Sequence, residues 1–86
     1  MKGLIKNYID LLSSEKLNEF GIKNDIHLSD KELEYLLNLV KNNWEDILND
    51  ETTYLEDLQK NINEKDFIKI KELFLYYKKR YRGYLF

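Results

Sequence analysis

The sequence predicts an all-α fold, a compact single-domain bundle of four to five short helices with the C-terminal helix at its centre. Three observations lead to this prediction. The composition favours helix, with no proline, three glycines and 35% charged residues. Apolar residues recur at three- and four-residue spacings in successive segments. Residues 67–77 are apolar nearly all round, which is typical of a helix that its neighbours bury. At 86 residues, the chain is expected to form one helical domain over 1–86.

The N-terminal part is expected to hold two helices. Apolar residues recur at helical spacing over residues 2–12, and polar side chains occupy the opposite side. Ser13 or Ser14 is placed to cap a second, short helix at about residues 14–20. Gly21 follows at the position where a left-handed residue commonly ends a helix. The stretch after it is expected to be an extended connector.

The firmest boundary in the sequence is a capping box. The Ser29 hydroxyl can accept a hydrogen bond from the amide of Glu32, whose carboxylate can reach back to the Ser29 amide. A third helix is therefore expected at about residues 30–43. Two asparagines then weaken the helical pattern, and residues 44–48 either continue this helix or form a separate short turn.

Two further helices are expected in the C-terminal half. Asn49 and Asp50 are good N-caps for a helix at about residues 51–61. The last helix is expected at residues 64–82, with acidic residues in its first turn and basic residues in its last, as the helix dipole favours. Gly83 is expected to end it.

The sequence offers no constellation for catalysis or metal binding. It has no cysteine and a single histidine, His27, which lies in the connector between two helices. No motif assembles a nucleophile, a base and an anion site, and the connector does not match a calcium loop. We therefore expect no enzyme activity, no cofactor and no metal. The absence of cysteine, of a signal-peptide core and of any run near the roughly 18–20 apolar residues of a membrane span leads us to expect a cytoplasmic protein with no membrane contact.

Aromatic residues are abundant for so short a chain, with seven tyrosines, four phenylalanines and one tryptophan. A small core cannot easily hide so many, and exposed aromatic residues are typical of interface centres. A protein partner or a homodimer contact is therefore expected at Tyr76, Tyr81 and Tyr84. Trp44 is a further candidate for this contact, although a tryptophan at a helix end more often covers the edge of the core.

The C-terminal end is basic, in contrast to the rest of the chain. Residues 1–66 carry eight lysines against fifteen carboxylates, whereas residues 67–86 carry six cations against one glutamate. Cations alternating with tyrosines suit phosphate contact with base stacking. The candidate polyanion contacts are Lys78, Lys79, Arg80 and Arg82. The helix dipole explains part of this pattern, and a sequence pI of about 5.4 argues against a general nucleic-acid binder.

Over residues 4–77 the chain resembles a family of short all-helical proteins of unknown function from low-GC Gram-positive bacteria. The resemblance lies in the order of helix caps and core positions: Ser13-Ser14, Ile26-His27-Leu28-Ser29, Asn49-Asp50-Glu51 and Leu73-Phe74. It implies a bacterial origin and an all-helical fold, and it transfers no catalytic residue, ligand or partner.

Together these patterns favour a small, non-enzymatic, cytoplasmic protein that acts as a protein–protein interaction or regulatory module. The alternative is a nucleic-acid-binding accessory protein that uses the basic, aromatic C-terminal end. A third interpretation, in which acidic residues at 45–57 mimic a nucleic acid, ranks below both because those residues are too sparse.

Overall fold

The all-α prediction is confirmed. The computed structural model describes the backbone of residues 2–85 and the side chains of residues 3–81, and the backbone of that range contains helices and no strand. The elements are α1 (Lys2–Asp10), α2 (Ser14–Lys23), α3 (Asp30–Asn49), the 3₁₀ helix η1 (Glu51–Tyr54), α4 (Leu55–Asn61) and α5 (Glu64–Leu85). None of these helices is long and apolar enough, within the described residues, to cross a membrane.

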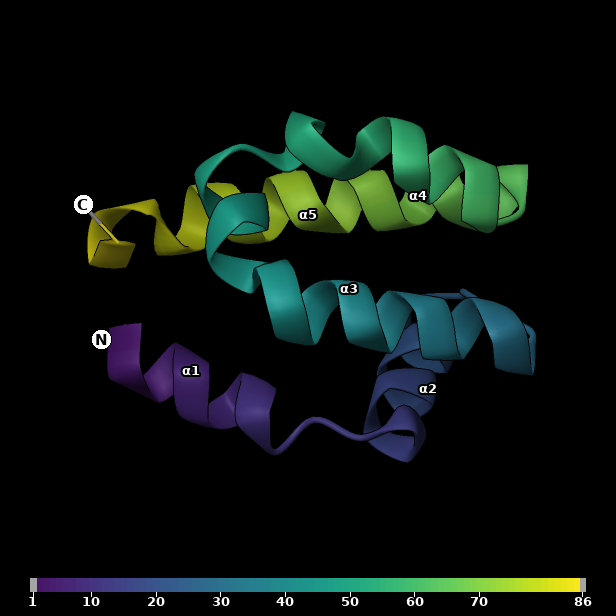
Figure 1. The fold of residues 1–86 in the computed structure, drawn as a ribbon, viewed down its shortest axis with the longest axis horizontal. Helices are drawn as coiled ribbons and strands as arrows, with labels where there is room; N and C mark the ends of the chain where they lie inside the picture. The colour runs from purple at the N-terminus through teal and green to yellow at the C-terminus, as the bar shows by residue number, and fades with distance from the viewer. Residues whose placement is uncertain (1, 86) are drawn as a thin grey trace.

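The helix at the centre is α3, not the C-terminal helix. It packs against every other element, whereas α5 packs mainly against α3, η1 and α4. Figure 1 shows α3 in the middle of the view, with α5 and α4 on one side and α1 and α2 on the other. The expectation for α5 was wrong because its apolar residues do not all face inward: Phe67 and Ile70 are buried, but Ile68, Leu75 and Tyr76 are exposed.

The core forms where α3, α4 and α5 meet the connectors. Leu58 of α4 is fully buried, at 0% exposure. The buried cluster around it comprises Leu12, Leu17, Ile26, Leu36, Leu39, Ile47, Ile62, Phe67 and Ile70. Since α2, α3, α4 and α5 all contribute to this cluster, burial of one apolar face of each supplies most of the driving force for folding.

The helix starts follow the sequence closely. Glu32 N donates to Ser29 Oγ at 3.2 Å and Ser29 N donates to Glu32 Oε1 at 2.9 Å, so the predicted capping box is confirmed. Ser13 caps α2 by accepting from Lys16 N at 3.2 Å. At the start of α5, Asp66 N donates to the side-chain oxygen of Asn63 at 3.0 Å.

The prediction that Gly21 ends the second helix is wrong. Gly21 lies inside α2, and the left-handed residue is Asp25, with φ 59°. The chain turns back so closely that Ile26 N donates to Gly21 O at 2.8 Å. A Cβ atom at position 21 would lie 3.3 Å from Ile26 O, so the glycine serves close packing of the returning chain.

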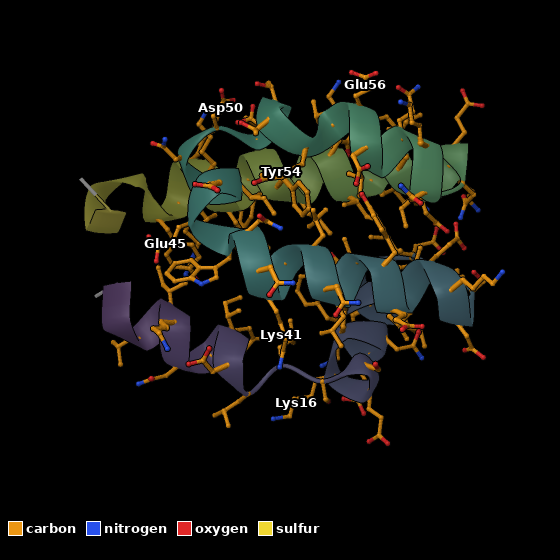
Figure 2. All side chains as sticks on the ribbon, in the orientation of Figure 1. Lys16, Lys41, Glu45, Asp50, Tyr54 and Glu56 are labelled. Atoms are coloured by element: carbon orange, nitrogen blue, oxygen red, sulfur yellow. The ribbon has the colours of Figure 1, made fainter. Side chains whose placement is uncertain are left out.

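Residues 44–48, which the sequence left open, are helical and follow the first part of α3 across a kink. Asn43 departs from helical geometry, with φ −135° and ψ 16°, and α3 then continues to Asn49. The kink is held by side chains: Asn43 Nδ2 donates to Leu39 O at 3.1 Å, and Tyr54 O–H donates to Asn43 Oδ1 at 2.9 Å. Figure 2 labels Tyr54 between η1 and α3.

Three other boundaries differ from prediction. The first helix ends at Asp10, two residues early. The expected helix over 51–61 begins as the 3₁₀ turn η1, which the Asp50 carboxylate caps by accepting from Thr52 N at 3.0 Å. Gly83 does not end the last helix, which continues to Leu85.

Candidate apolar cavity and aromatic surface

A cavity of about 570 Å³ lies among α1, α2, α3 and α5. Within residues 3–81, every residue that lines it is aliphatic, aromatic or glycine. Val40 and Trp44 of α3 and Phe74 and Tyr77 of α5 belong to its walls, and Leu4 belongs to the wall on α1. The volume falls within the range of roughly 300–1,000 Å³ that is typical of small-molecule sites.

The cavity exists because α1 is packed loosely at this end of the molecule. Figure 1 places the N-terminal end of α1 and the C-terminal part of α5 at the same end of the bundle. The main packing partner of α1 is α3. Lys41 extends from α3 toward the end of α1 and its Nζ donates to Asp10 O at 3.2 Å (Figure 2). In this region the residue that joins the buried core cluster is Leu12, two residues after the end of α1.

The outer side of α1 presents an apolar stripe. Leu4, Tyr8 and Leu11 are 67%, 61% and 71% exposed, respectively. Their spacing of four and three residues puts all three side chains on one helical face. Leu4 and Tyr8 belong to α1, and Leu11 follows directly after its end. Leu4 and Tyr8 also border the cavity, whereas Leu11 does not line it. We call these three residues the α1 stripe.

An aromatic cluster forms the α5 side of the cavity. The rings of Tyr77 and Tyr81 are stacked, with centroids 5.9 Å apart and an interplanar angle of 7°. Tyr76 meets Tyr77 edge-on at 5.1 Å, and Phe20 of α2 lies 6.1 Å from Tyr77. Burial raises the pKa of Tyr77, and the neighbouring hydroxyls of Tyr81, Tyr76 and Tyr8 add to that effect. Tyr77 is therefore neutral at physiological pH.

Arg80 lies at the edge of this cluster. Its guanidinium carbon is 5.9 Å from the centroid of the Tyr81 ring, and its side chain is exposed. Hydrogen bonds with Tyr81 and Tyr76 raise the pKa of Arg80, so its charge is permanent. Because Tyr81 lines the cavity, a fixed positive charge stands beside an apolar space.

The predicted partner residues end up in different environments. Trp44 is 8% exposed and lines the cavity, which agrees with the alternative that it covers the core edge. Tyr81 is half-buried and lines the same cavity, whereas Tyr76 is 53% exposed. The side chain of Tyr84 lies outside the described residues. The fold thus brings Trp44 and Tyr81 together, although they are far apart in the chain.

The cations predicted to contact a polyanion also lie in different environments. Lys78 Nζ lies 2.8 Å from Glu51 Oε2 in a largely buried ion pair, and the nearby ammonium group lowers the pKa of the Glu51 carboxyl. Lys79 and Arg80 are exposed. The side chain of Arg82 lies outside the described residues. Of the three cations whose side chains are described, Lys78 is therefore held in an ion pair within the fold.

Sequence reasoning did not identify the contribution of α1 to this site. A signal was present: Leu4, Tyr8 and Leu11 run parallel to a second apolar stripe of Ile5 and Leu12. Two stripes provide more apolar surface than one neighbouring helix can cover.

The other candidate residue, His27, is exposed, and its Nε2 lies 3.2 Å from Asp25 Oδ1. Among the described residues, no group of three or more His, Cys, Asp or Glu side chains has the geometry to hold a metal ion.

No protein-family model, curated protein or solved structure matches the chain. The resemblance to short helical proteins of low-GC Gram-positive bacteria therefore stays a prediction.

Proposed function

We propose that this protein is a small, non-enzymatic interaction or regulatory module of the cytoplasm that binds another protein through the α1 stripe. The observation that carries the proposal is the exposure of three large apolar side chains on one helical face, at Leu4, Tyr8 and Leu11. Single exposed apolar residues are ordinary on protein surfaces, but a contiguous apolar face commonly marks a contact site.

The α1 stripe can supply a useful share of a binding energy. Full burial of a leucine side chain contributes about 1.5–3 kcal/mol, so burial of the two-thirds that is exposed contributes about 1–2 kcal/mol for each of Leu4 and Leu11. Anchors at this spacing are the pattern by which one helix packs on another helix or in a groove. The costs of association reduce the net gain, as in any complex.

The test compares Leu11→Lys with the matched control Gln59→Lys. Both positions are exposed and both substitutions add one positive charge, but Gln59 lies on α4, away from the α1 stripe. Tagged wild-type and variant proteins would be used to capture partners from the native cell, with quantitative mass spectrometry. We expect Leu11→Lys to capture at least tenfold less of a specific partner that the wild type and Gln59→Lys retain. Equal capture by all three proteins would rule out the α1 stripe as the contact.

Sedimentation analysis separates the two forms of this proposal. In a homodimer the same stripe would pack on its symmetry mate, and Leu11→Lys would produce a monomer. A wild-type protein that sediments as a strict monomer at all concentrations would remove the homodimer and leave a different protein as the partner.

The alternative, that the protein binds nucleic acid, is supported by fewer of the predicted contact residues. Lys79 and Arg80 are exposed next to Tyr76, but Lys78 is paired with Glu51. This alternative predicts salt-sensitive retention on DNA or RNA that Arg80→Glu combined with Arg82→Glu abolishes. Absence of retention at low salt would eliminate it.

A further inference from the structure

We propose that the cavity among α1, α2, α3 and α5 is a binding site for a single-chain anionic amphiphile, a fatty carboxylate. Its hydrocarbon chain would lie along α3 between α1 and α5, and its carboxylate would meet Arg80. This inference goes beyond the proposed protein contact. Leu4 and Tyr8 border both sites, but Leu11 belongs only to the protein contact, and Arg80 belongs only to the amphiphile site.

The dimensions of the cavity suit a hydrocarbon chain. Its lining residues on α3 run from Leu36 to Leu48, which at about 1.5 Å per residue spans about 18 Å. A volume of about 570 Å³ over that length gives a mean cross-section of about 30 Å². A helix of a protein partner would not fit, because a helix with its side chains is about 10–12 Å wide and needs about three times this cross-sectional area. A single hydrocarbon chain, whose carbons pack at about 4 Å, fits inside.

The chemistry of the walls also suits a hydrocarbon chain. Among the residues whose side chains are described, none that lines the cavity is charged, and Val40, Ile47 and Phe74 present only carbon to the space. A large cavity with such walls offers water too few hydrogen-bond partners, and cavities of this type take up apolar molecules. Side chains that line an empty space lose dispersion contacts, and an acyl chain would restore them.

The charge at the cavity edge selects the head group. Arg80 lies beside Tyr81, which lines the cavity, and α5 carries no acidic residue from position 73 to position 81. Lys78, the neighbouring cation toward η1, is already neutralised by Glu51. Arginine binds carboxylates with two parallel hydrogen bonds, and tyrosine hydroxyls of the aromatic cluster can add to them. A cationic head group would meet the like charge of Arg80.

Titrations with laurate, decanoate and octanoate below their micelle concentrations test the proposal. Trp44 is the single tryptophan of the chain and lines the cavity, so its fluorescence reports occupancy. We expect affinity to rise about fourfold for each added methylene group, since each buried methylene contributes about 0.8 kcal/mol. Dodecyltrimethylammonium, a cationic amphiphile with the same chain length, should bind at least tenfold more weakly than laurate.

Two variants locate the site. Arg80→Gln should weaken laurate binding about tenfold, the order expected for loss of a hydrogen bond to a charged group. Lys71→Gln is the matched control, because it removes one positive charge from an exposed position of the same helix that does not line the cavity, and it should bind as the wild type does. Val40→Phe, which fills part of the cavity, should weaken laurate binding more than octanoate binding.

Several results would overturn the proposal: no laurate binding, equal affinity for laurate and the cationic amphiphile, or equal loss in Arg80→Gln and Lys71→Gln. Binding only to anionic vesicles would indicate a membrane surface instead. A laurate-free dimer that covers Trp44 would indicate that a second copy occupies the cavity. The protein contact is tested separately by Leu11→Lys, because Leu11 does not line the cavity, so loss of laurate binding in Arg80→Gln can be told apart from loss of the protein contact.

Discussion

The carboxylate of Glu32 joins the starts of two helices that lie far apart in the chain. One of its oxygens accepts from Ser29 N at 2.9 Å and completes the capping box of α3. The other accepts from Asn63 N at 2.7 Å and from the Asn63 side-chain amide at 3.1 Å, just before α5. Glu32→Ala removes all three hydrogen bonds and leaves their donors to water.

The size of the loss follows from these contacts. Loss of a helix cap costs about 1 kcal/mol. Each of the two bonds from Asn63 contributes about 0.5–1.5 kcal/mol, and water can reach this half-buried site to replace part of that contribution. We expect Glu32→Ala to lower the free energy of unfolding by about 2 kcal/mol, which corresponds to a fall in melting temperature of about 8–16 °C for a domain of this size.

Urea denaturation followed by circular dichroism would measure the effect. Glu34→Ala is the matched control, because Glu34 is exposed on the same helix two residues later. If Glu32→Ala and Glu34→Ala had the same stability within about 0.5 kcal/mol, the role assigned to Glu32 would be refuted.

The contribution of Glu32 should also depend on pH. Burial raises the pKa of its carboxyl, but hydrogen bonds from Ser29 and Asn63 together outweigh burial and hold the pKa below the ordinary value of 4.5. A folded-state pKa below the unfolded value means that the stabilisation is complete above pH 4.5 and is lost as the pH falls through the lowered pKa. The wild type and Glu32→Gln should therefore converge in stability in acid.

Three further predictions concern stability. Leu58→Ala should cost about 3 kcal/mol in urea denaturation, because it removes most of a fully buried leucine side chain and leaves a cavity in the core. Tyr35→Phe should cost about 1 kcal/mol through loss of the 2.5 Å bond to Asp57. The pKa of Tyr35 is raised mainly by burial and then by the bond to Asp57. Because the folded-state pKa lies above the unfolded value, the wild type should lose stability as the pH rises above 10, and Tyr35→Phe should lose less stability. At Asp25, where φ is 59°, Gly and Asn should be tolerated better than Ala in thermal unfolding, and equal melting temperatures would contradict this.

Local signals in the sequence predicted the helix starts well. The capping box at Ser29 needs only residues three apart, so neighbouring residues determine its geometry. The helix ends were harder to predict. Gly21 has the residue type of a helix terminator, but its small size is used for the approach of Ile26, which depends on tertiary packing. Gly83 costs its helix only about 1 kcal/mol, too little to end it.

The candidate site was less predictable than the fold. Aromatic and basic residues near the C-terminus stand out in the sequence, but the sequence does not specify that Lys78 would pair with Glu51. Nor does it specify that Trp44 and Tyr81 would line one cavity, because the space left between helices depends on how α1 packs on α3. Pairings between distant residues of this kind are set by the assembled fold.

The loose packing of α1 has a consequence for the order in which backbone amides exchange with solvent. The helices from α2 to α5 share one buried cluster and should open only in global unfolding, whereas α1 is held mainly by α3 and by the bond from Lys41 to Asp10 O. The amides of α1 should therefore exchange through a separate, low-energy opening while the other helices stay protected. A molecule bound on either face of α1 would slow that exchange, so deuterium uptake in this one helix measures occupancy even when the bound molecule is unidentified.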